Sequence, residues 1–302
     1  MNHDFGKGLF PAVKGSGFSM EGYFVWCGSC IKGDDGRYYL FASRWPNATS
    51  FPLGYMTSSE IVLATTDSLD KPFKFEKVIF SKRDGYWDGM MTHNPQVVKY
   101  KGGYLMYYIG NPDGTVENRR IGVAYSKSLT DGWERPDKPI DIDFSLDLNN
   151  PAALVTDDGI YLAFRDAYLT VYMAHAEEYD GKYKIISENI FPENIIEDMF
   201  LFRNNGRYEI ICEDARGHYT GVVGGGAYFY SEDIINWKQA TPPMVYDRTV
   251  EYNDGTVLEL QRRERPQLLV DGERIYLFTT AKINGETRER GGVTWNMLQE
   301  LK

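Results

Sequence analysis

The chain has 302 residues, of which 42% are hydrophobic and 15% aromatic, and this composition supports a packed core and argues against intrinsic disorder. Its formal net charge of -10 at pH 7 disfavours a nucleic-acid partner, because phosphate backbones are bound by basic surfaces. No apolar run approaches the roughly 20 residues of a membrane-spanning helix, so we expect no membrane span.

The first residues lack the basic and then apolar layout of a secretory signal. We expect a cytoplasmic protein, or a periplasmic or secreted one whose leader has been removed, and the sequence leaves both open. Three cysteines are too few for a disulfide framework. Cys27 and Cys30 have the spacing of a redox or zinc motif, but no second Cys/His pair with metal-ligand spacing follows, so we predict no such metal site.

One local pattern recurs five times along the chain. Each copy has a pair of polar residues, then Pro or a substitute, an apolar stretch, a Gly-containing turn and an aromatic-rich strand. An aromatic residue follows the third position of each copy after nine or ten residues. Such a repeat indicates one supersecondary unit copied around an axis or along a solenoid. The copies begin with Gly28-Ser29-Cys30, His93-Asn94-Pro95, Asn149-Asn150-Pro151, Glu197-Asp198-Met199 and Glu264-Arg265-Pro266.

Further strand-like runs lie between the copies. Residues 59–66, 120–126 and 227–231 end in small polar residues and precede turn residues, and residues 73–79 are typical of a short outer strand. Each unit is therefore predicted to have four short strands. Successive copies lie 65, 56, 48 and 67 residues apart, which suits four-stranded units, and no helix-period segment of useful length interrupts them.

Four-stranded sheets repeated around an axis form a β-propeller, which protects its sheet edges by closing on itself. We therefore predict an all-β fold: a five-bladed β-propeller with four-stranded antiparallel blades around a central channel, in one domain over residues 1–302. Residues 291–295 are expected to complete the last blade beside an N-terminal strand. A two-sheet sandwich or jelly roll is the alternative, but it does not explain a fivefold motif.

The innermost strand of every blade lines the channel of a propeller, so the five polar pairs should converge near its axis. Charged and amide side chains are costly to bury without partners, which favours a ligand site over turn capping alone. The candidates from the five pairs are Ser29, His93, Asn94, Asn150, Glu197, Asp198, Glu264 and Arg265.

A second group of candidates lies at or near strand ends. A pocket of carboxylates, guanidinium groups, amides and aromatics, with no phosphate-binding Gly loop, suits a polyhydroxylated ligand. We therefore expect an oligo- or polysaccharide partner. Tryptophans could provide flat faces for sugar rings. These further candidates are Trp26, Arg44, Asp88, Arg165, Asp166, Glu213, Asp214 and His218.

The copies resemble those of the five-bladed β-propeller glycosidases of glycoside hydrolase families 43, 32, 68, 62 and 117, over nearly the whole chain from about Tyr23 to Trp295. The set His-Asn-Pro, Asn-Asn-Pro, Glu-Asp and Arg-Glu-Arg-Pro-Gln is similar to uncharacterised glycosidases of this superfamily. The resemblance implies a glycoside hydrolase, and we expect an enzyme that acts on the end or side chain of a polysaccharide.

In family 43, as the resemblance implies, an Asp in blade one is the general base, an Asp in a middle blade tunes the acid, and a Glu before Pro is the general acid. Glu197 matches the acid position. Ser29 stands where the base is expected and Asn150 where the tuning Asp is expected. These departures mean that the family mechanism does not transfer whole.

Glycoside hydrolysis normally needs two carboxyl groups. The sequence offers Glu264, Asp166 or Asp88 as the second one. His93 is an alternative proton carrier, because imidazole titrates near neutral pH and the family 117 relatives use a His as acid.

Three further expectations stay open at this stage. The chain is a glycan-binding propeller without catalysis, or a lyase or other sugar-modifying enzyme, if no second carboxylate acts. Some relatives hold a calcium ion at the channel centre, although no compact loop here specifies one. The substrate carries a carboxylate or sulfate if two arginines face the channel, since guanidinium grips such groups bidentately.

Overall fold

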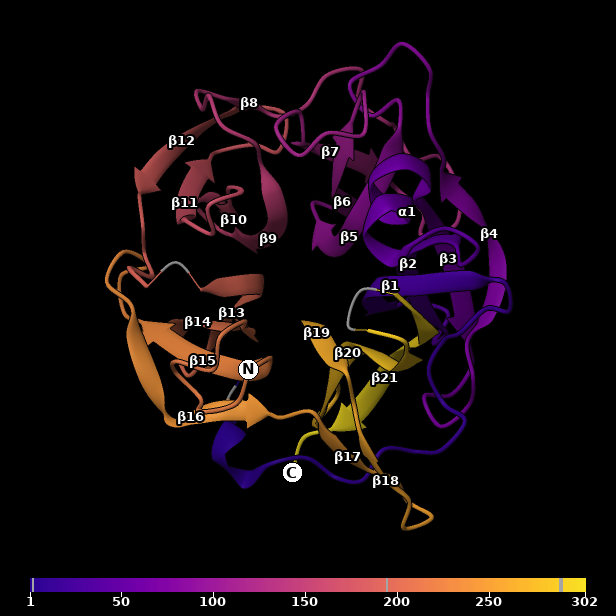
Figure 1. The fold of residues 1–302 in the computed structure, drawn as a ribbon. Helices are drawn as coiled ribbons and strands as arrows, with labels where there is room; N and C mark the ends of the chain where they lie inside the picture. The colour runs from indigo at the N-terminus through magenta and orange to yellow at the C-terminus, as the bar shows by residue number, and fades with distance from the viewer. Residues whose placement is uncertain (2, 194, 288–289) are drawn as a thin grey trace.

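The computed structural model describes residues 1, 3–193, 195–287 and 290–302. Five sheets stand side by side around a central axis, which confirms the predicted five-bladed β-propeller (Figure 1). Blades one, three and four each have four antiparallel strands counted from the channel outward. Their strands are β1 (Tyr23–Lys32), β2 (Tyr38–Pro46), β3 (Glu60–Thr66) and β4 (Lys74–Phe80); β9 (Asn149–Thr156), β10 (Gly159–Arg165), β11 (Val171–Ala176) and β12 (Lys182–Ser187); and β13 (Ile196–Asn204), β14 (Arg207–Asp214), β15 (Gly225–Ser231) and β16 (Lys238–Tyr246).

Blades two and five each have three named strands in the described part of the chain. In blade two an isolated bridge between Tyr125 and Glu134 stands where an outer strand would lie. The strands are β5 (Met91–Tyr100), β6 (Gly103–Asn111) and β7 (Arg120–Ser126); and β19 (Arg262–Asp271), β20 (Arg274–Gly285) and β21 (Gly291–Glu300). Three shorter strands lie outside these sets or at their edge: β8 (Asp141–Ile142), parallel to β12, and the hairpin β17 (Thr249–Glu251) and β18 (Val257–Glu259).

The N-terminal segment joins the last blade, as the sequence predicts. Phe18 forms an antiparallel bridge with Asn296 of β21, and Leu9 forms another with Leu301. A short 3-10 helix, η1 (Phe5–Lys7), lies in this segment. In the view of Figure 1 the N-terminus lies beside blade four, and the C-terminus lies below blade five. Strand pairing between the ends therefore helps to close the ring of blades.

The second strand of each blade is buried along most of its length, and β2 and β6 are buried along almost all of it. Both faces of these sheets pack against a neighbouring blade, so the usual alternation of buried and exposed residues is absent. Tyr107 and Tyr108, successive residues on opposite faces of β6, are both fully buried. The tyrosine-rich strands of the sequence are thus the layers that hold the blades together.

A short helix interrupts blade one, contrary to the sequence prediction. Helix α1 (Phe51–Ser58) connects β2 to β3 and lies over the channel face (Figure 1). Pro52 stands in its first turn, where the missing N–H of proline removes no helical bond. Eight residues are too few to show a helical period in the sequence. No helix within the described residues has the length and hydropathy of a membrane span.

Each innermost strand is interrupted by a β-bulge at or directly before its polar pair. One residue per bulge has a φ of 51–57°, in the left-handed region that non-glycine residues seldom adopt. A bulge re-aims a side chain relative to the regular strand. The five bulge residues are Cys27, Asn94, Asn150, Asp198 and Arg265.

This register corrects the predicted alignment of blade one. The bulge falls at Cys27 and Gly28, so Cys27 is the counterpart of Asn94. The prediction that Ser29 occupies this position is wrong. The Ser29 hydroxyl instead accepts a hydrogen bond from the backbone N–H of Val97, at 3.0 Å, between blades one and two.

Candidate active site

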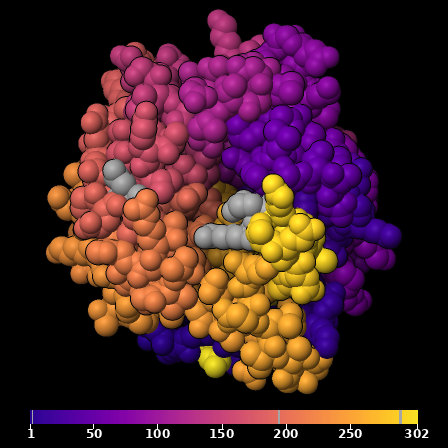
Figure 2. Space-filling view, in the orientation of Figure 1, coloured from indigo at the N-terminus to yellow at the C-terminus, as the bar shows by residue number. Residues whose placement is uncertain are grey.

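The channel opens into a pocket on the face that carries α1, and this face is hollowed between the blades in Figure 2. The pocket has a volume of about 210 Å³ and is lined from all five blades. One wall is aromatic, another is charged, and amide side chains form part of the floor. The lining residues are Trp26, Trp45, Phe51, Pro52, Tyr55, His93, Asn94, Ile109, Asn149, Asn150, Arg165, Glu197, Asp198, Arg262, Glu264 and Arg265.

The aromatic wall is built from blade one and α1. The Phe51 ring lies 4.9 Å from Trp26 and 5.1 Å from Trp45, centroid to centroid, with near-perpendicular ring planes. Edge-to-face packing of this kind is favourable and fixes the rings relative to one another. The guanidinium of Arg262 lies 5.2 Å from the Phe51 ring, where the charged wall begins. Helix α1 therefore sets the shape of this side of the pocket.

His93 belongs to the aromatic wall and is buried. Its ring stacks on Tyr55 at 5.0 Å, and its Nδ1 lies 2.8 Å from the Ser59 hydroxyl. Burial lowers the pKa of His93 well below its usual value, and the positive charges of Arg265 and Arg119 lower it further. The imidazole is thus neutral at neutral pH.

Carboxylates and arginines alternate on the charged wall. Glu197 at the start of β13 forms a 2.7 Å ion pair with Arg165 at the end of β10 in the neighbouring blade. Glu264 on β19 forms an ion pair with Arg262, two residues before it on the same strand. The Glu197 side chain is 31% exposed, whereas that of Glu264 is 4% exposed. Glu197 thus lies nearer to solvent, and Glu264 lies deeper.

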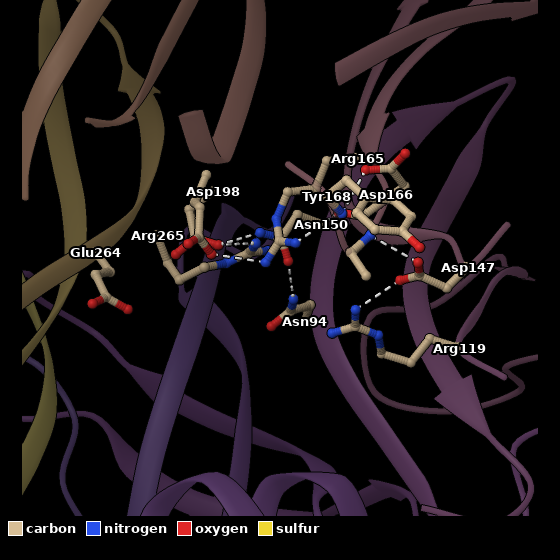
Figure 3. A network of polar contacts seen from close by, with 12 residues as sticks. Asn94, Arg119, Asp147, Asn150, Arg165, Asp166, Tyr168, Asp198, Glu264 and Arg265 are labelled. Carbon is tan, nitrogen blue, oxygen red and sulfur yellow. Dashed lines mark hydrogen bonds and ion pairs between the residues drawn. The ribbon is translucent and has the colours of Figure 1, made fainter. Parts of the chain in front are cut away.

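The floor of the pocket is a ring of side chains, one from each blade. The Cys27 thiol donates to Asn94 Oδ1 at 2.6 Å, and Asn94 Nδ2 donates to Asn150 Oδ1 at 2.9 Å. Asn150 Nδ2 and Arg265 Nη1 both donate to Asp198 Oδ1, at 2.6 and 3.0 Å. Figure 3 shows Asn150 reaching Asn94 on one side and Asp198 on the other. All five residues are the buried bulge residues, so the bulges direct this ring to the channel axis.

A third carboxyl group lies behind the charged wall. Glu213 on β14 pairs in register with Glu197, and its carboxyl lies within 4.8 Å of those of Asp198 and Glu264. Burial raises the pKa of Glu213 well above its usual value, and the neighbouring carboxylates add to this effect. Burial also raises the pKa of Asp198, although the charge of Arg265 opposes this rise. Glu213 and Asp198 therefore hold their protons more tightly than isolated carboxylates do.

Among the described residues, the carboxyl groups of Asp198, Glu213 and Glu264 come nearest to forming a metal site. Calcium binds six to eight oxygen ligands of this type. However, Arg265 lies 3.0 Å from Asp198, and Arg262 is paired with Glu264. A calcium ion here would have to displace these guanidinium groups or lie against their positive charge. The site therefore does not fit a resident calcium ion.

Three predicted site residues lie away from the pocket. Asp88 is fully buried in blade two, where Arg83 and Arg135 form ion pairs with it at 3.1 and 2.7 Å. Arg44 is paired with Glu60 at 2.7 Å on the neighbouring strand of blade one. Ser29 is bonded to the backbone of Val97 between blades one and two, as described above. Their charges and hydroxyl are satisfied by nearby structure, which the sequence does not reveal.

Asp166, Asp214 and His218 are also outside the pocket lining. Asp166 Oδ1 accepts the backbone N–H groups of Tyr168 and Thr170, at 2.8 and 3.0 Å, and so holds the loop after β10 (Figure 3). Asp214 accepts backbone N–H groups in the loop that contains His218. Short-range capping of loops, with the carboxylate turned to the backbone, explains these two aspartates.

The remaining predicted residues do converge. The pocket brings together Trp26, His93, Asn94, Asn150, Arg165, Glu197, Asp198, Glu264 and Arg265, with Glu213 directly behind. Sequence reasoning did not include Asn149 or Arg262 among the site residues. It also missed the α1 residues Phe51 and Tyr55. The Ser50-Phe51-Pro52 run, a helix-start pattern, is the signal that could have found α1.

No known family model and no curated protein matches this sequence. Among solved structures, the chain is similar to BT0996 in an RGII complex, with a TM-score of 0.74, 15% identity, and 99% of this chain and 93% of that chain covered. It is also similar to Zg3597, a family 117 glycoside hydrolase of the marine bacterium Zobellia galactanivorans, with a TM-score of 0.67, 15% identity, and 97% and 88% covered. A third is CoXyl43, a family 43 β-xylosidase/α-arabinofuranosidase from a compost microbial metagenome, with a TM-score of 0.66, 16% identity, and 98% and 94% covered. The chain therefore shares its five-bladed propeller fold with these solved structures.

Proposed function

We propose that the protein is a glycoside hydrolase that removes a single sugar from the end or side chain of an oligo- or polysaccharide. The observation that carries the proposal is the pocket itself, where Glu197 and Glu264 from neighbouring blades face an aromatic wall. Two carboxyl groups beside a sugar-sized cavity are what glycoside hydrolysis requires.

The shape of the pocket supports action on chain ends. Its volume of about 210 Å³ is below the roughly 300–1,000 Å³ of pockets that enclose drug-sized ligands. The ring residues from Cys27 to Arg265 lie across the floor of the pocket, and we expect them to keep a glycan chain from passing through the channel. One sugar ring enters the pocket, and the rest of the glycan stays outside.

We assign the acid role to Glu197 and the second role to Glu264. Glu197 is the more exposed of the two carboxyl groups. It therefore lies on the solvent side of the pocket, where the leaving group of a bound glycan and the oxygen that must be protonated would lie. Glu264 lies deeper, where an ionised carboxylate would activate water or attack the sugar. His93 is neutral and bonded to Ser59, so it fits a role in shaping the pocket better than one as proton donor.

A neutral sugar suits this pocket better than an acidic one. Arg165, Arg262 and Arg265 are each paired with a carboxylate of the site. An anionic substituent would have to compete with these carboxylates for the same guanidinium groups. The description of CoXyl43 as a β-xylosidase/α-arabinofuranosidase in complex with xylotriose makes neutral pentosides the first substrates to test.

The experiment is a screen of aryl glycosides, starting with xylosides and arabinofuranosides, and of plant oligosaccharides. We expect turnover of at least one substrate, reduced about 10²–10⁴-fold in Glu197→Gln, the range that a general acid contributes. Glu259→Gln, at an exposed carboxylate on β18, is the matched control and should retain full activity.

Blade one supplies Trp26 and Cys27 to the site and no carboxylate, which favours a second candidate function. In that case the protein binds glycan without cleaving it. Binding of an oligosaccharide by the wild type, with no turnover of any substrate, would replace the hydrolase proposal with this one.

A further inference from the structure

We propose that the guanidinium group of Arg265 takes the place of a bound cation at the channel centre, so that this propeller closes its channel and holds its charge without calcium. The resemblance to the propeller glycosidases implies a calcium ion at this place. The similar solved structure of CoXyl43 is a calcium-free form. The inference concerns the stability of the fold and stands whether or not the protein is a hydrolase.

The first support is the position of Arg265. It occupies the blade-five place in a ring to which every blade contributes the same bulge residue, with φ values of 51–57°. The side chain is 2% exposed, so its charge is removed from solvent. A charge in such a place needs a partner within the protein.

The second support is the direction of the hydrogen bonds in the ring. Donation runs from Cys27 through Asn94 and Asn150 to Asp198, and from Arg265 to the same oxygen of Asp198. Both arcs of the ring thus end on Asp198. Donors aligned in this way place positive ends toward the carboxyl group, as a cation would.

The third support is the charge around Asp198. The carboxyl groups of Asp198, Glu213 and Glu264 lie within 4.8 Å of one another, and all three residues are buried. Such a group resembles the oxygen cage of a divalent cation. The positive charge beside it comes from Arg265, at 3.0 Å from Asp198, and from Arg262, paired with Glu264. The protein therefore supplies by side chains the charge that a metal would supply.

The chain offers a matched control next to Arg265. Arg263 is also buried, 1% exposed, but its partners are uncharged: Gln299 Oε1 at 2.6 Å, Thr279 Oγ1 at 3.2 Å and the backbone oxygen of Asp247 at 3.1 Å. Removing Arg263 should destabilise the protein without leaving the carboxylate of Asp198 uncompensated.

The experiment measures thermal unfolding of the intact protein with EDTA, with millimolar calcium, and with sodium chloride at matched ionic strength. For the wild type we expect the same Tm in all three solutions. For Arg265→Ala we expect a Tm several degrees lower in EDTA and a partial recovery with calcium that sodium does not reproduce. For Arg263→Ala we expect a lowered Tm that calcium leaves unchanged.

If Arg265→Ala does not fold, Arg265→Gln, which keeps a hydrogen-bond donor on a shorter and uncharged side chain, is measured in its place. A wild-type Tm that falls in EDTA and returns with calcium would overturn the proposal. The proposal would also be overturned if calcium raised the Tm of the Arg265 variant no more than it raises the Tm of Arg263→Ala. In that case the guanidinium group of Arg265 would not substitute for a bound cation.

Discussion

Blades one and four place their innermost strands in the same geometry but give the pocket opposite chemistry. Both strands carry a bulge, with φ values of 55° at Cys27 and 54° at Asp198. Blade four presents Glu197 and Asp198 there, backed by Glu213 on its second strand. Blade one presents Trp26 and Cys27, backed by Ser43.

The two blades show that the position in the repeat determines where a side chain points. The residue type at that position determines what chemistry the side chain can provide. The residue before each bulge faces the pocket, and the bulge residue faces the axis. In the proposed function, Glu197 of blade four and Glu264 of blade five would serve the reaction, while the aromatic side of blade one would bind a sugar ring. Substitutions at matched positions of the two blades test this contrast.

The largest expected effect on stability comes from the axial residue of blade four. Asp198→Ala leaves the buried Arg265 without its partner, and breaking a buried pair in this way costs about 3–5 kcal/mol. Chemical denaturation should show a lower free energy of unfolding with an unchanged m-value. A loss below about 1 kcal/mol would mean that the ring does not brace the channel.

The pH dependence of stability should expose the buried carboxyl group behind blade four. The pKa of Glu213 in the folded protein is raised above its ordinary value of 4.5. The protonated Glu213 side chain therefore contributes its full stabilisation below pH 4.5. This contribution is lost as the pH rises toward the folded-state pKa. Each unit of pKa shift corresponds to about 1.4 kcal/mol. Glu213→Gln should therefore lose less stability than the wild type when the pH is raised from 4.5 toward alkaline values.

Tm curves of the two proteins against pH test this expectation, with Glu259→Gln as the exposed control. Parallel curves for wild type and Glu213→Gln would show that this carboxyl does not hold its proton in the fold.

The aromatic position of blade one should affect binding more than chemistry. Trp26→Leu keeps an apolar side chain but removes the flat face, and aromatic contacts are worth about 0.5–1.5 kcal/mol beyond burial. Steady-state kinetics should show a KM raised by about threefold to tenfold, with kcat nearly unchanged. An equal fall in kcat would place Trp26 with the residues that act only in the transition state.

The smallest effect is expected at the axial residue of blade one. Cys27→Ser keeps a donor toward Asn94 Oδ1, so the ring stays complete. We expect a change in unfolding free energy within the roughly 0.5–1.5 kcal/mol of one hydrogen bond. A loss as large as that of Asp198→Ala would remove the contrast between the two blades.

The fold could be predicted from the sequence because the repeat places similar residues at regular spacing. The spacing could not show which residue of a pair faces the pocket, since the positive φ at each bulge sets this direction. Blade one has Gly28 where three other copies have Pro, so its predicted alignment lies two residues late, at Ser29 instead of Cys27.

The partners of the charged candidates could not be predicted either. Asp88 and Asp166 have the same residue type as a catalytic acid, but nearby arginines or backbone N–H groups satisfy them. The pair of Glu197 with Arg165 joins two blades, 32 positions apart in the chain. Such pairs depend on how the blades pack, and no local pattern encodes them.

The most direct test of the central claim compares two glycosides of the sugar that the enzyme releases, one with a good leaving group and one with a poor one. A general acid matters only when the leaving group needs a proton. We predict that kcat/KM of Glu197→Gln falls about 10²–10⁴-fold on an alkyl glycoside, which has the poor leaving group, and falls far less on a dinitrophenyl glycoside, which has the good one. The Glu264→Gln variant should lose activity on both substrates. Equal losses of Glu197→Gln on the two substrates would contradict the assignment of Glu197 as the acid of this pocket.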